Sequence, residues 1–411
     1  MAGEILFLAH RVPFPPDRGD KIRSHHLLKA LAKIAPVHAG CLAESDGDLA
    51  QETELGALTA SHFLVRRDKN LVLAGLQALA KGLPVSLTAF DHPGLRRWVA
   101  ATLAERPIGT VFVFSGQMGQ YVPADFAGRV VIDLCDVDSA KFEAYGAGRS
   151  GPRAWIDRRE ARRLAAEEER LAHRANSTLL VSEAEAALFR SRLRDAQGLD
   201  VRALCNGIDT ATFDPQAIAP QQALAVEPGP HIVFTGQMDY APNVAAVVRV
   251  AERLLPAIRQ YHPRATFHVV GRAPTAQLHK LDGQGGVRVW GEVPDVRPFL
   301  AAADLVLAPL AIARGIQNKV LEAMAMARPV VLSPEAATGI DARDGEHFAI
   351  GADDGALIER SLALLDGGPA ALAMGAAARR YVVEHQGWDA MLAPLAALVG
   401  GQPFGDRRDA A

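Results

Sequence analysis

The sequence predicts an α/β protein made of two doubly wound, Rossmann-like lobes. The chain has 411 residues, more than one ordinary hydrophobic core accommodates, so two domains are expected. Short, continuous apolar runs alternate with helix-length amphipathic stretches, which is typical of parallel strands buried on both faces. This alternation pauses near residues 206–230 and then starts again, which indicates a second sheet.

Each lobe is expected to contain at least five strands. The predicted strands of the first lobe are 4–9, 37–42, 110–114, 129–134 and 177–181, and those of the second are 231–235, 265–270, 286–290, 304–309 and 329–333. The predicted organisation is a first lobe at 1–210, a Pro/Gln/Ala-rich linker at 211–230, a second lobe at 231–385, a helix at 386–400 that crosses back to the first lobe, and a flexible tail at 401–411. Ligands of such sheets bind beyond the carboxyl ends of the strands, so the functional residues are expected in the loops that follow strands, facing a central cleft.

Composition favours a globular enzyme in the cytoplasm. Hydrophobic residues make up 49% of the chain and charged residues 22%, and the formal net charge is −3, so no nucleic-acid partner is expected. The three cysteines show neither disulfide nor metal-ligand spacing. Neither a signal peptide nor a membrane-spanning run is recognisable, so any membrane contact is expected to be peripheral, at the inner face of the cytoplasmic membrane.

The segment GIQNKVLEAMAMARPVV at 315–331 carries the clearest chemical pattern. A strand ends in a loop with Gly315, and a helix is predicted to begin around Gln317, with Lys319 and Glu322 on one face. The amino end of such a helix suits a diphosphate, and a carboxylate one turn further can accept hydrogen bonds from both hydroxyls of a ribose. On spacing alone, a surface helix with a Lys–Glu pair explains the pattern equally well.

This segment resembles the donor-binding signature of glycosyltransferase family 4, which implies the GT-B architecture and makes Glu322 the ribose ligand. The family usually carries another Glu eight positions earlier, where this chain has Arg314. Three further segments, 234–247, 267–274 and 289–310, resemble the remainder of the family's nucleotide-binding lobe, and where many relatives carry a phosphate-binding Lys this chain has Asn243. The resemblance implies diphosphate contacts by Arg314, Lys319 and Arg272, and further donor contacts by Gly236, Gln237, Val293, Gly315, Ile316, Gln317 and Asn318.

The loop that follows the first predicted strand contains Gly19 and a cation-rich helix start. Gly19 permits close backbone approach, and Asp20, Lys21 and Arg23 are candidates for steering a phosphate or an anionic acceptor. The alternative is an ordinary loop with solvated charges. In family 4 a glycine-containing loop here abuts the donor phosphates, so the resemblance adds Gly19 to the donor site. Together with residues 131–145, the loop looks closest to a bacterial subgroup associated with exopolysaccharide and exosortase (PEP-CTERM) systems, which implies a lipid-linked acceptor.

DVDSAK at 136–141 contains the Asp-x-Asp string by which a different glycosyltransferase fold holds a metal. Because the string follows a strand of a doubly wound lobe, we do not interpret it as a metal site. Asp136 and Asp138 are instead candidates for the catalytic side of the site, and Ser139 for the acceptor. The structural alternative is that Asp138 or Ser139 caps a helix. The resemblance implies transfer without a metal, and no cofactor is expected because the nucleotide sugar is a substrate.

The resemblance implies transfer of a sugar from a nucleoside-diphosphate sugar to a glycan or lipid-linked glycan in bacterial exopolysaccharide or cell-surface polysaccharide synthesis. The resemblance implies that the anomeric configuration is retained. A nucleotide-sugar 2-epimerase or a phosphorylase on the same fold, and a non-catalytic nucleotide-sugar-binding protein, remain alternatives. A dinucleotide-dependent oxidoreductase would require G-x-G-x-x-G after the first strand, which LAHRVPFPPDRGD lacks. The Arg-rich stretch 153–174 could lay a basic face on an anionic membrane surface, but it also contains Glu160 and Glu167 to Glu169 at ion-pairing spacing, so a solvated helix is the preferred interpretation.

Overall fold

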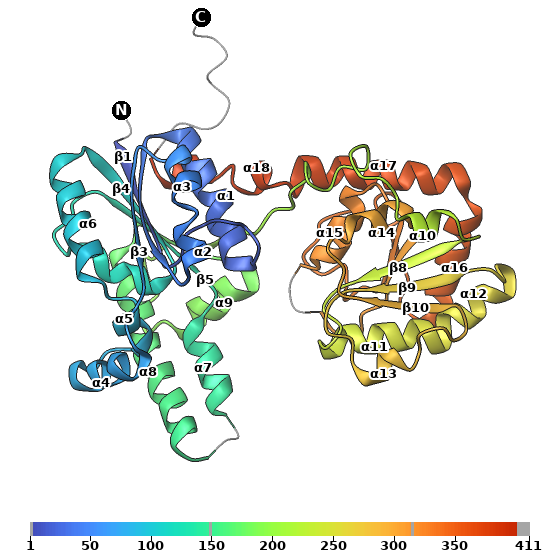
Figure 1. The fold of residues 1–411 in the computed structure, drawn as a ribbon, viewed down its shortest axis with the longest axis horizontal. Coiled ribbons are helices and arrows are strands. Elements are labelled where there is room, and N and C mark those ends of the chain that lie inside the picture. Colours follow the sequence, from blue (N-terminus) through green and yellow to red (C-terminus); the bar gives the residue numbers. More distant parts are fainter. Residues whose placement is uncertain (1–2, 148–149, 314–315, 401–411) are drawn as a thin grey trace, which may run out of the picture. The chain divides into compact units, whose positions relative to one another are not determined.

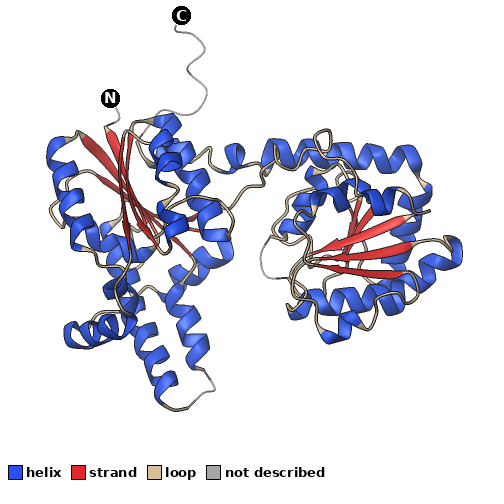
Figure 2. Cartoon of the chain, in the orientation of Figure 1, coloured by secondary structure: helices blue, strands red, loops and turns tan. Residues whose placement is uncertain are grey.

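A computed structural model describes residues 3–147, 150–313 and 316–400. The chain divides into a first lobe, Met1–Asn206 with Met391–Ala411, and a second lobe, Gly207–Ala390. Each lobe contains a parallel sheet with helices on both faces (Figures 1 and 2). The predicted α/β fold class with two doubly wound lobes is therefore confirmed.

The first lobe contains a seven-stranded sheet in the order β3-β2-β1-β4-β5-β6-β7 within the described residues. Its strands are β1 Glu4–Ala9, β2 Val37–Ala43, β3 Ser61–Arg66, β4 Ile108–Phe114, β5 Arg129–Cys135, β6 Ser177–Leu180 and β7 Val201–Ala203. Its helices are α1 Gly19–Ile34, α2 Asp46–Leu49, α3 Glu52–Leu58, α4 Leu71–Lys81, α5 Val85–Ala89, α6 Pro93–Glu105, the 3₁₀ helix η1 Gly116–Tyr121, α7 Asp138–Gly146, α8 Pro152–Arg174 and α9 Glu183–Arg192, with α19 Leu395–Leu398 near the carboxyl end.

The second lobe contains a six-stranded sheet in the order β10-β9-β8-β11-β12-β13, again within the described residues. Its strands are β8 His231–Thr235, β9 Thr266–Val270, β10 Val287–Gly291, β11 Leu305–Ala308, β12 Val330–Leu332 and β13 Ala349–Ile350. Its helices are α10 Gln222–Ala225, α11 Ala241–Arg249, the π-helix η2 Val250–Leu254, α12 Leu255–Tyr261, α13 Ala276–His279, α14 Arg297–Ala302, α15 Asn318–Ala325, α16 Asp354–Asp366 and α17 Gly368–His385, followed by α18 Trp388–Met391 at the boundary between the lobes.

Burial explains why the central strands form where they do. Every residue of β8 and β11 is buried, and Phe234, Phe267 and Leu305 belong to one continuous core. Such strands have no solvent face, so the sequence shows an unbroken apolar run. The strand order changes direction between β8 and β11, which pair directly with each other: β9 and β10 lie on one side of this pair, and β12 and β13 lie on the other. The loops that follow these two strands therefore diverge, and this switch point is where open α/β sheets bind ligands.

The sequence analysis predicts a linker at residues 211–230. In the structure these residues, together with residues 207–210, lie within the second lobe. Leu224 is buried in its core, and the backbone N–H of Gln221 donates to the carbonyl oxygen of Pro298 over 2.8 Å. The carboxyl-terminal segment packs into the first lobe, where the Thr110 hydroxyl donates to the carbonyl oxygen of Val399 over 3.0 Å. Among the described residues no single helix is long and apolar enough to cross a membrane, although α16 and α17, bent by 105°, pass that test as a pair.

Candidate functional site

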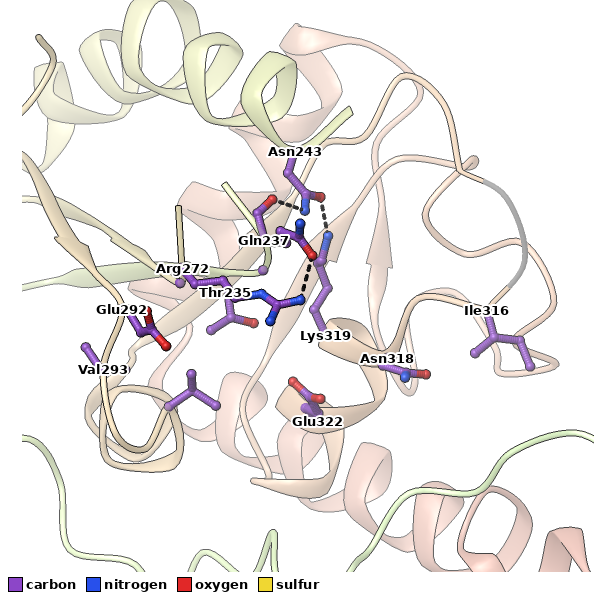
Figure 3. A pocket seen from close by; sticks show the side chains of 13 residues that line it. Thr235, Gln237, Asn243, Arg272, Glu292, Val293, Ile316, Asn318, Lys319 and Glu322 are labelled. Carbon is purple, nitrogen blue, oxygen red and sulfur yellow. Dashed lines mark hydrogen bonds between the residues drawn. The ribbon is translucent and has the colours of Figure 1, made fainter. Parts of the chain in front are cut away.

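A cavity of about 500 Å³ opens at the carboxyl ends of the second-lobe strands (Figure 3). Four consecutive strand-to-helix connections supply its walls, after β8, β9, β10 and β11. The lining residues are Thr235, Gly236, Gln237, Asn243, Gly271, Arg272, Glu292, Val293, Val296, Ile316, Asn318, Lys319 and Glu322. The cavity thus lies at the switch point of the sheet, where the fold is expected to bind a ligand.

Two glycines bring the loops after β8 and β9 into direct backbone contact. Gly236 and Gly271 have φ values of 154° and 150°, and a Cβ on Gly271 would lie 1.6 Å from the carbonyl oxygen of Gly236. Only glycine fits this approach. One wall of the cavity is consequently backbone rather than side chain.

A hydrogen-bonded chain of four residues runs along this wall (Figure 3). The Lys319 ammonium donates to Oδ1 of Asn243 over 2.5 Å, and Nδ2 of Asn243 donates to the carbonyl oxygen of Gln237 over 2.8 Å. A guanidinium N–H of Arg272 donates to Oε1 of Gln237 over 3.0 Å. The Lys319 ammonium also lies 4.8 Å from the centre of the Phe234 ring. Two cations are thereby held at the cavity by neutral groups, an arrangement suited to an anionic ligand.

The helix α15 presents Lys319 and Glu322 to the cavity while Val320, Leu321 and Ala323 pack inward. Burial raises the pKa of Glu322 to about 7, and the nearby Lys319 only partly opposes this. Burial likewise lowers the pKa of Lys319 to about 8, against the effect of Glu322. Ionisable groups with perturbed pKa values in a concave site are typical of functional sites.

The structure brings together most of the donor residues that the sequence analysis names. Gly236, Gln237, Arg272, Val293, Ile316, Asn318, Lys319 and Glu322 all line the cavity. Gln317 immediately precedes α15 and does not line the cavity. Arg314 and Gly315 lie outside the described residues. Thr235, Asn243, Gly271, Glu292 and Val296 line the cavity without having been named as site residues. Their positions in the sequence could have identified them, because each lies at the carboxyl end of a predicted strand or within about eight residues after it.

Residues 229–367, which include every residue that lines the cavity, match the family model described as "Glycosyl transferases group 1". This match spans most of the second lobe, which therefore resembles a group 1 glycosyltransferase domain. The chain is accordingly a glycosyltransferase enzyme with the GT-B fold. No curated protein matches this glycosyltransferase by sequence.

Solved structures share the fold over nearly the whole chain. HepE of Anabaena, crystallised in complex with UDP, is 17% identical with a TM-score of 0.62, over 97% of this glycosyltransferase and 99% of HepE. WaaG, a glycosyltransferase involved in lipopolysaccharide biosynthesis, is 17% identical with a TM-score of 0.57, over 97% and 100% of the two chains. Sucrose-phosphate synthase of Thermosynechococcus elongatus is 16% identical with a TM-score of 0.58, over 96% and 98%. At such identities the likeness is evidence for the fold.

In the first lobe of the glycosyltransferase, the loop after β1 holds an ionic cluster around Asp20. Arg11 contacts the Asp20 carboxylate at 2.7 Å, Arg18 at 3.0 Å and His10 at 3.3 Å. Although burial raises the pKa of Asp20, the hydrogen bond with His10 and the charge of Arg11 outweigh it and hold that pKa well below its usual range. Gly19, the first residue of α1, has open space where a Cβ would lie, and its expected contact with the donor phosphates stays a prediction.

Lys21 and Arg23 are structural residues in the glycosyltransferase, which corrects the expectation that they steer an anion. The Lys21 ammonium is buried and donates to Asp48 over 2.6 Å and to the carbonyl oxygen of Phe14 over 3.1 Å. Arg23 is 2% exposed and donates to the fully buried carboxylate of Asp133 over 2.9 Å. A sequence shows the charge of a residue but not the direction of its side chain, and here Arg23 points toward Asp133 of β5 and Lys21 toward Asp48 of α2.

Asp136 and Asp138 both contact the ammonium of Lys141, at 2.8 and 3.2 Å. The capping expected of Asp138 or Ser139 is not found, because Val137 precedes α7 and makes no side-chain cap. The first N–H groups are instead satisfied from other helices: Val137 N–H donates to Glu185 over 2.8 Å and Ser139 N–H to Glu168 over 2.9 Å. Ser139 itself is buried.

Proposed function

We propose that this glycosyltransferase takes its sugar from a nucleoside-diphosphate sugar bound in the second-lobe cavity. The observation that carries the proposal is the placement of Lys319 and Glu322 on one face of α15, facing the cavity beside the glycine contact. Lys319 and Arg272 supply positive charge for the diphosphate, and the Glu322 carboxylate accepts hydrogen bonds from the ribose hydroxyls. Val293 and Val296 offer an apolar wall to the base.

The proposed chemistry follows from the charge that develops as the glycosyl–phosphate bond breaks. Negative charge accumulates on the departing diphosphate, and cations already held in place stabilise it without reorganisation. Lys319 and Arg272 are held by neutral partners, so their charges remain available to the leaving group. Arg314, which precedes Gly315, is proposed to add a third cation. In keeping with the resemblance to family 4, the proposal includes retention at the anomeric carbon.

UDP-glucose is the first donor to test. HepE of Anabaena has been crystallised in complex with UDP-glucose and shares the fold of this chain, with a TM-score of 0.59 at 14% identity. We propose a lipid-linked glycan as the acceptor, in the assembly of an exopolysaccharide or another cell-surface polysaccharide. WaaG, which shares the fold, is involved in lipopolysaccharide biosynthesis.

We further propose that transfer requires neither metal nor cofactor. Lys141 holds both carboxylates of the Asp-x-Asp string, at distances of 2.8 and 3.2 Å, and so competes with a divalent cation for them. Transfer activity is accordingly expected to survive dialysis against EDTA. Activity that disappears with EDTA and returns with Mg²⁺ or Mn²⁺ would contradict this part of the proposal.

The decisive experiment measures donor binding by calorimetry and thermal shift. We expect UDP-glucose to stabilise the protein more than GDP-glucose, ADP-glucose or NAD. Glu322→Gln is expected to bind UDP-glucose at least about tenfold more weakly, because a charged acceptor of two hydrogen bonds is lost. Glu335→Gln, at an exposed position of the same lobe, is the matched control. Stabilisation by NAD alone, or an unchanged affinity in Glu322→Gln, would overturn the proposal.

A further inference from the structure

The helix α4 of the first lobe is packed with its apolar side outward. Its two buried residues are Ala74 and Ala78, one turn apart. Five larger apolar side chains lie on the surface and are 53–71% exposed, namely Leu71, Val72, Leu73, Leu76 and Leu79. A helix of a globular protein normally does the reverse, with its large apolar residues in the core and its small or polar residues outside. Contiguous apolar surface of this kind marks an interaction site.

Backbone contacts fix α4 in this orientation. The carbonyl oxygen of Ala74 accepts from the Thr88 hydroxyl over 2.8 Å, and that of Ala78 accepts from the Arg159 guanidinium over 2.8 Å. Asn70 caps the amino end by accepting from Val72 N–H, and Gly82 ends the helix with a φ of 66°. The alanine face is therefore held against α5 and α8, and the leucine face cannot turn inward without breaking these bonds.

The adjacent start of α8 adds exposed aromatic, apolar and cationic side chains. Trp155 and Ile156 are 55% and 49% exposed. The acidic residues of this stretch, Asp157 and Glu160, are buried, and the Glu160 carboxylate accepts from the backbone N–H groups of Val85 and Ser86. Four arginines of the same stretch are exposed: Arg153, Arg158, Arg162 and Arg163. The exposed charge of the first three turns of α8 is thus cationic.

The two helices contact each other at one end of the first lobe (Figure 1). Arg159 of α8 bonds the carbonyl oxygens of Ala78 and Leu83, and the Arg163 guanidinium lies 3.7 Å from where a Cβ on Gly82 would be. Residues 69–90, which include all of α4 and α5, contain no Asp or Glu, and their only charges are Lys69 and Lys81. The exposed charged residues of α4 and of the first three turns of α8 are thus all cationic.

We propose that this α4–α8 surface docks the protein on an anionic lipid bilayer, with α4 lying in the plane of the interface. Apolar side chains enter the boundary of the acyl chains, Trp155 lies at the level of the headgroups, and the arginines contact lipid phosphates. At 11 residues, α4 is about 16 Å long and too short to cross a hydrocarbon core of about 30 Å. Charge favours a membrane over a second copy of the chain, since an isologous dimer would bring two cationic surfaces together.

This inference goes beyond the proposed transfer reaction and rests on the first lobe alone. If the acceptor is lipid-linked, docking would keep the enzyme at the surface where that acceptor resides. The donor cavity belongs to the other lobe, so membrane binding and donor binding are separately measurable.

Co-sedimentation of the full-length protein with vesicles tests the inference. We expect the protein to sediment with phosphatidylcholine vesicles that contain phosphatidylglycerol, to stay mostly in solution with phosphatidylcholine alone, and to be released by high salt. Val72→Gln with Leu76→Gln removes two exposed apolar side chains, and Arg153→Glu with Arg162→Glu reverses two exposed charges. Each pair is expected to lower vesicle partitioning by about tenfold or more. Leu372→Gln, at a 74% exposed leucine of α17, is the matched control and should bind like the unaltered protein.

Thermal stability and UDP-glucose binding are expected to be unchanged in all these variants, because the altered side chains are exposed and none of them lines the donor cavity. This separates a failure of membrane docking from a failure of the donor site. Unaltered protein that remains in the supernatant with anionic vesicles overturns the inference. Vesicle binding that survives both paired variants, or a lipid-free dimer that the Val72→Gln and Leu76→Gln pair disperses, overturns it as well.

Discussion

The Nζ atom of Lys319 lies 2.5 Å from Oδ1 of Asn243, and this hydrogen bond joins α15 to α11 at the wall of the cavity. An amide oxygen carries no formal charge, so the bond positions the ammonium without neutralising it. Asn243 also donates to the carbonyl oxygen of Gln237 over 2.8 Å, which fixes the orientation of the amide. A cation that is already oriented loses little side-chain entropy when an anion binds.

Lys319→Ala is expected to weaken UDP-glucose binding by about tenfold to a hundredfold, which corresponds to the loss of a hydrogen bond to a charged group. Isothermal titration calorimetry of the variant would measure this. Lys280→Ala removes an exposed cation from the same lobe and controls for the change in net charge. Equal affinities in the two variants would contradict a direct role for Lys319.

Donor binding is expected to depend on pH through Glu322 and Lys319. The Glu322 carboxyl, with a pKa of about 7, must lose its proton to accept from the ribose hydroxyls, so affinity should fall as pH drops below 7. Lys319, with a pKa of about 8, must keep its proton, so affinity should also fall as pH rises above 8. Titrations from pH 5.5 to pH 9 should give a maximum near neutrality, with an acidic limb that Glu322→Gln flattens. An acidic limb that persists unchanged in the variant would assign it to another group.

Glu322 should also lower the stability of the unliganded protein at neutral pH. Its folded pKa of about 7 lies above that of an unfolded Glu, about 4.3, so the folded state binds the proton more tightly between these values. Its contribution to the free energy of unfolding therefore decreases as pH rises through this window, and the penalty is complete above pH 7. Glu322→Gln should raise the melting temperature at pH 8 and change it little at pH 4, as scanning calorimetry would show. A lower melting temperature at pH 8 would be inconsistent with this account.

Gly271→Ala should lower the free energy of unfolding by about 3 kcal/mol or more, because strain at a positive φ combines with a clash against the Gly236 carbonyl. Gly283→Ala provides the comparison, since Gly283 also has a positive φ, 74°, but has nothing within 4 Å of its would-be Cβ. That variant should lose only about 1–2 kcal/mol. Urea unfolding measures both, and similar losses in the two variants would mean that the backbone contact is unimportant.

Arg23→Ala should destabilise the protein by about 3–5 kcal/mol by leaving the buried carboxylate of Asp133 without its cation. Arg18→Ala, which removes a half-exposed member of the Asp20 cluster, should cost about 1 kcal/mol or less. Urea unfolding would compare the two. An Arg23→Ala protein of normal stability, with a raised KM for the acceptor, would restore the acceptor-steering role.

The sequence was informative where burial leaves a continuous apolar signal. All ten predicted strands are present, and the central ones, such as β8 and β11, are buried throughout. The strands that the sequence analysis missed lie toward the sheet edges. β3 is only half-buried, and β7 and β13 contain three and two residues, so none produces an apolar run of recognisable length.

The spacing of residues in the sequence predicted the strands better than it predicted the directions of side chains. The spacing of Lys319 and Glu322 indicated a shared helix face, and both line the cavity. Lys21 and Arg23 follow a glycine-containing loop in the same way, yet both are buried against carboxylates distant in sequence, Asp48 and Asp133. The outward leucines of α4 were also missed, because an apolar run looks the same whether its large residues or its alanines pack inward.

The contact between Gly236 and Gly271 limits how this cavity can be redesigned. A side chain at Gly271 would clash with the Gly236 carbonyl oxygen, and a Cβ at Gly236 would lie 2.8 Å from the side-chain amide nitrogen of Asn243, so neither position accepts a side chain without displacing its neighbours. Variation in ligand preference is then left to side chains such as Glu292, Val293 and Val296, which line the cavity and are not assigned to the diphosphate. A combinatorial library that randomises these three positions and keeps both glycines would explore new donors on an intact scaffold.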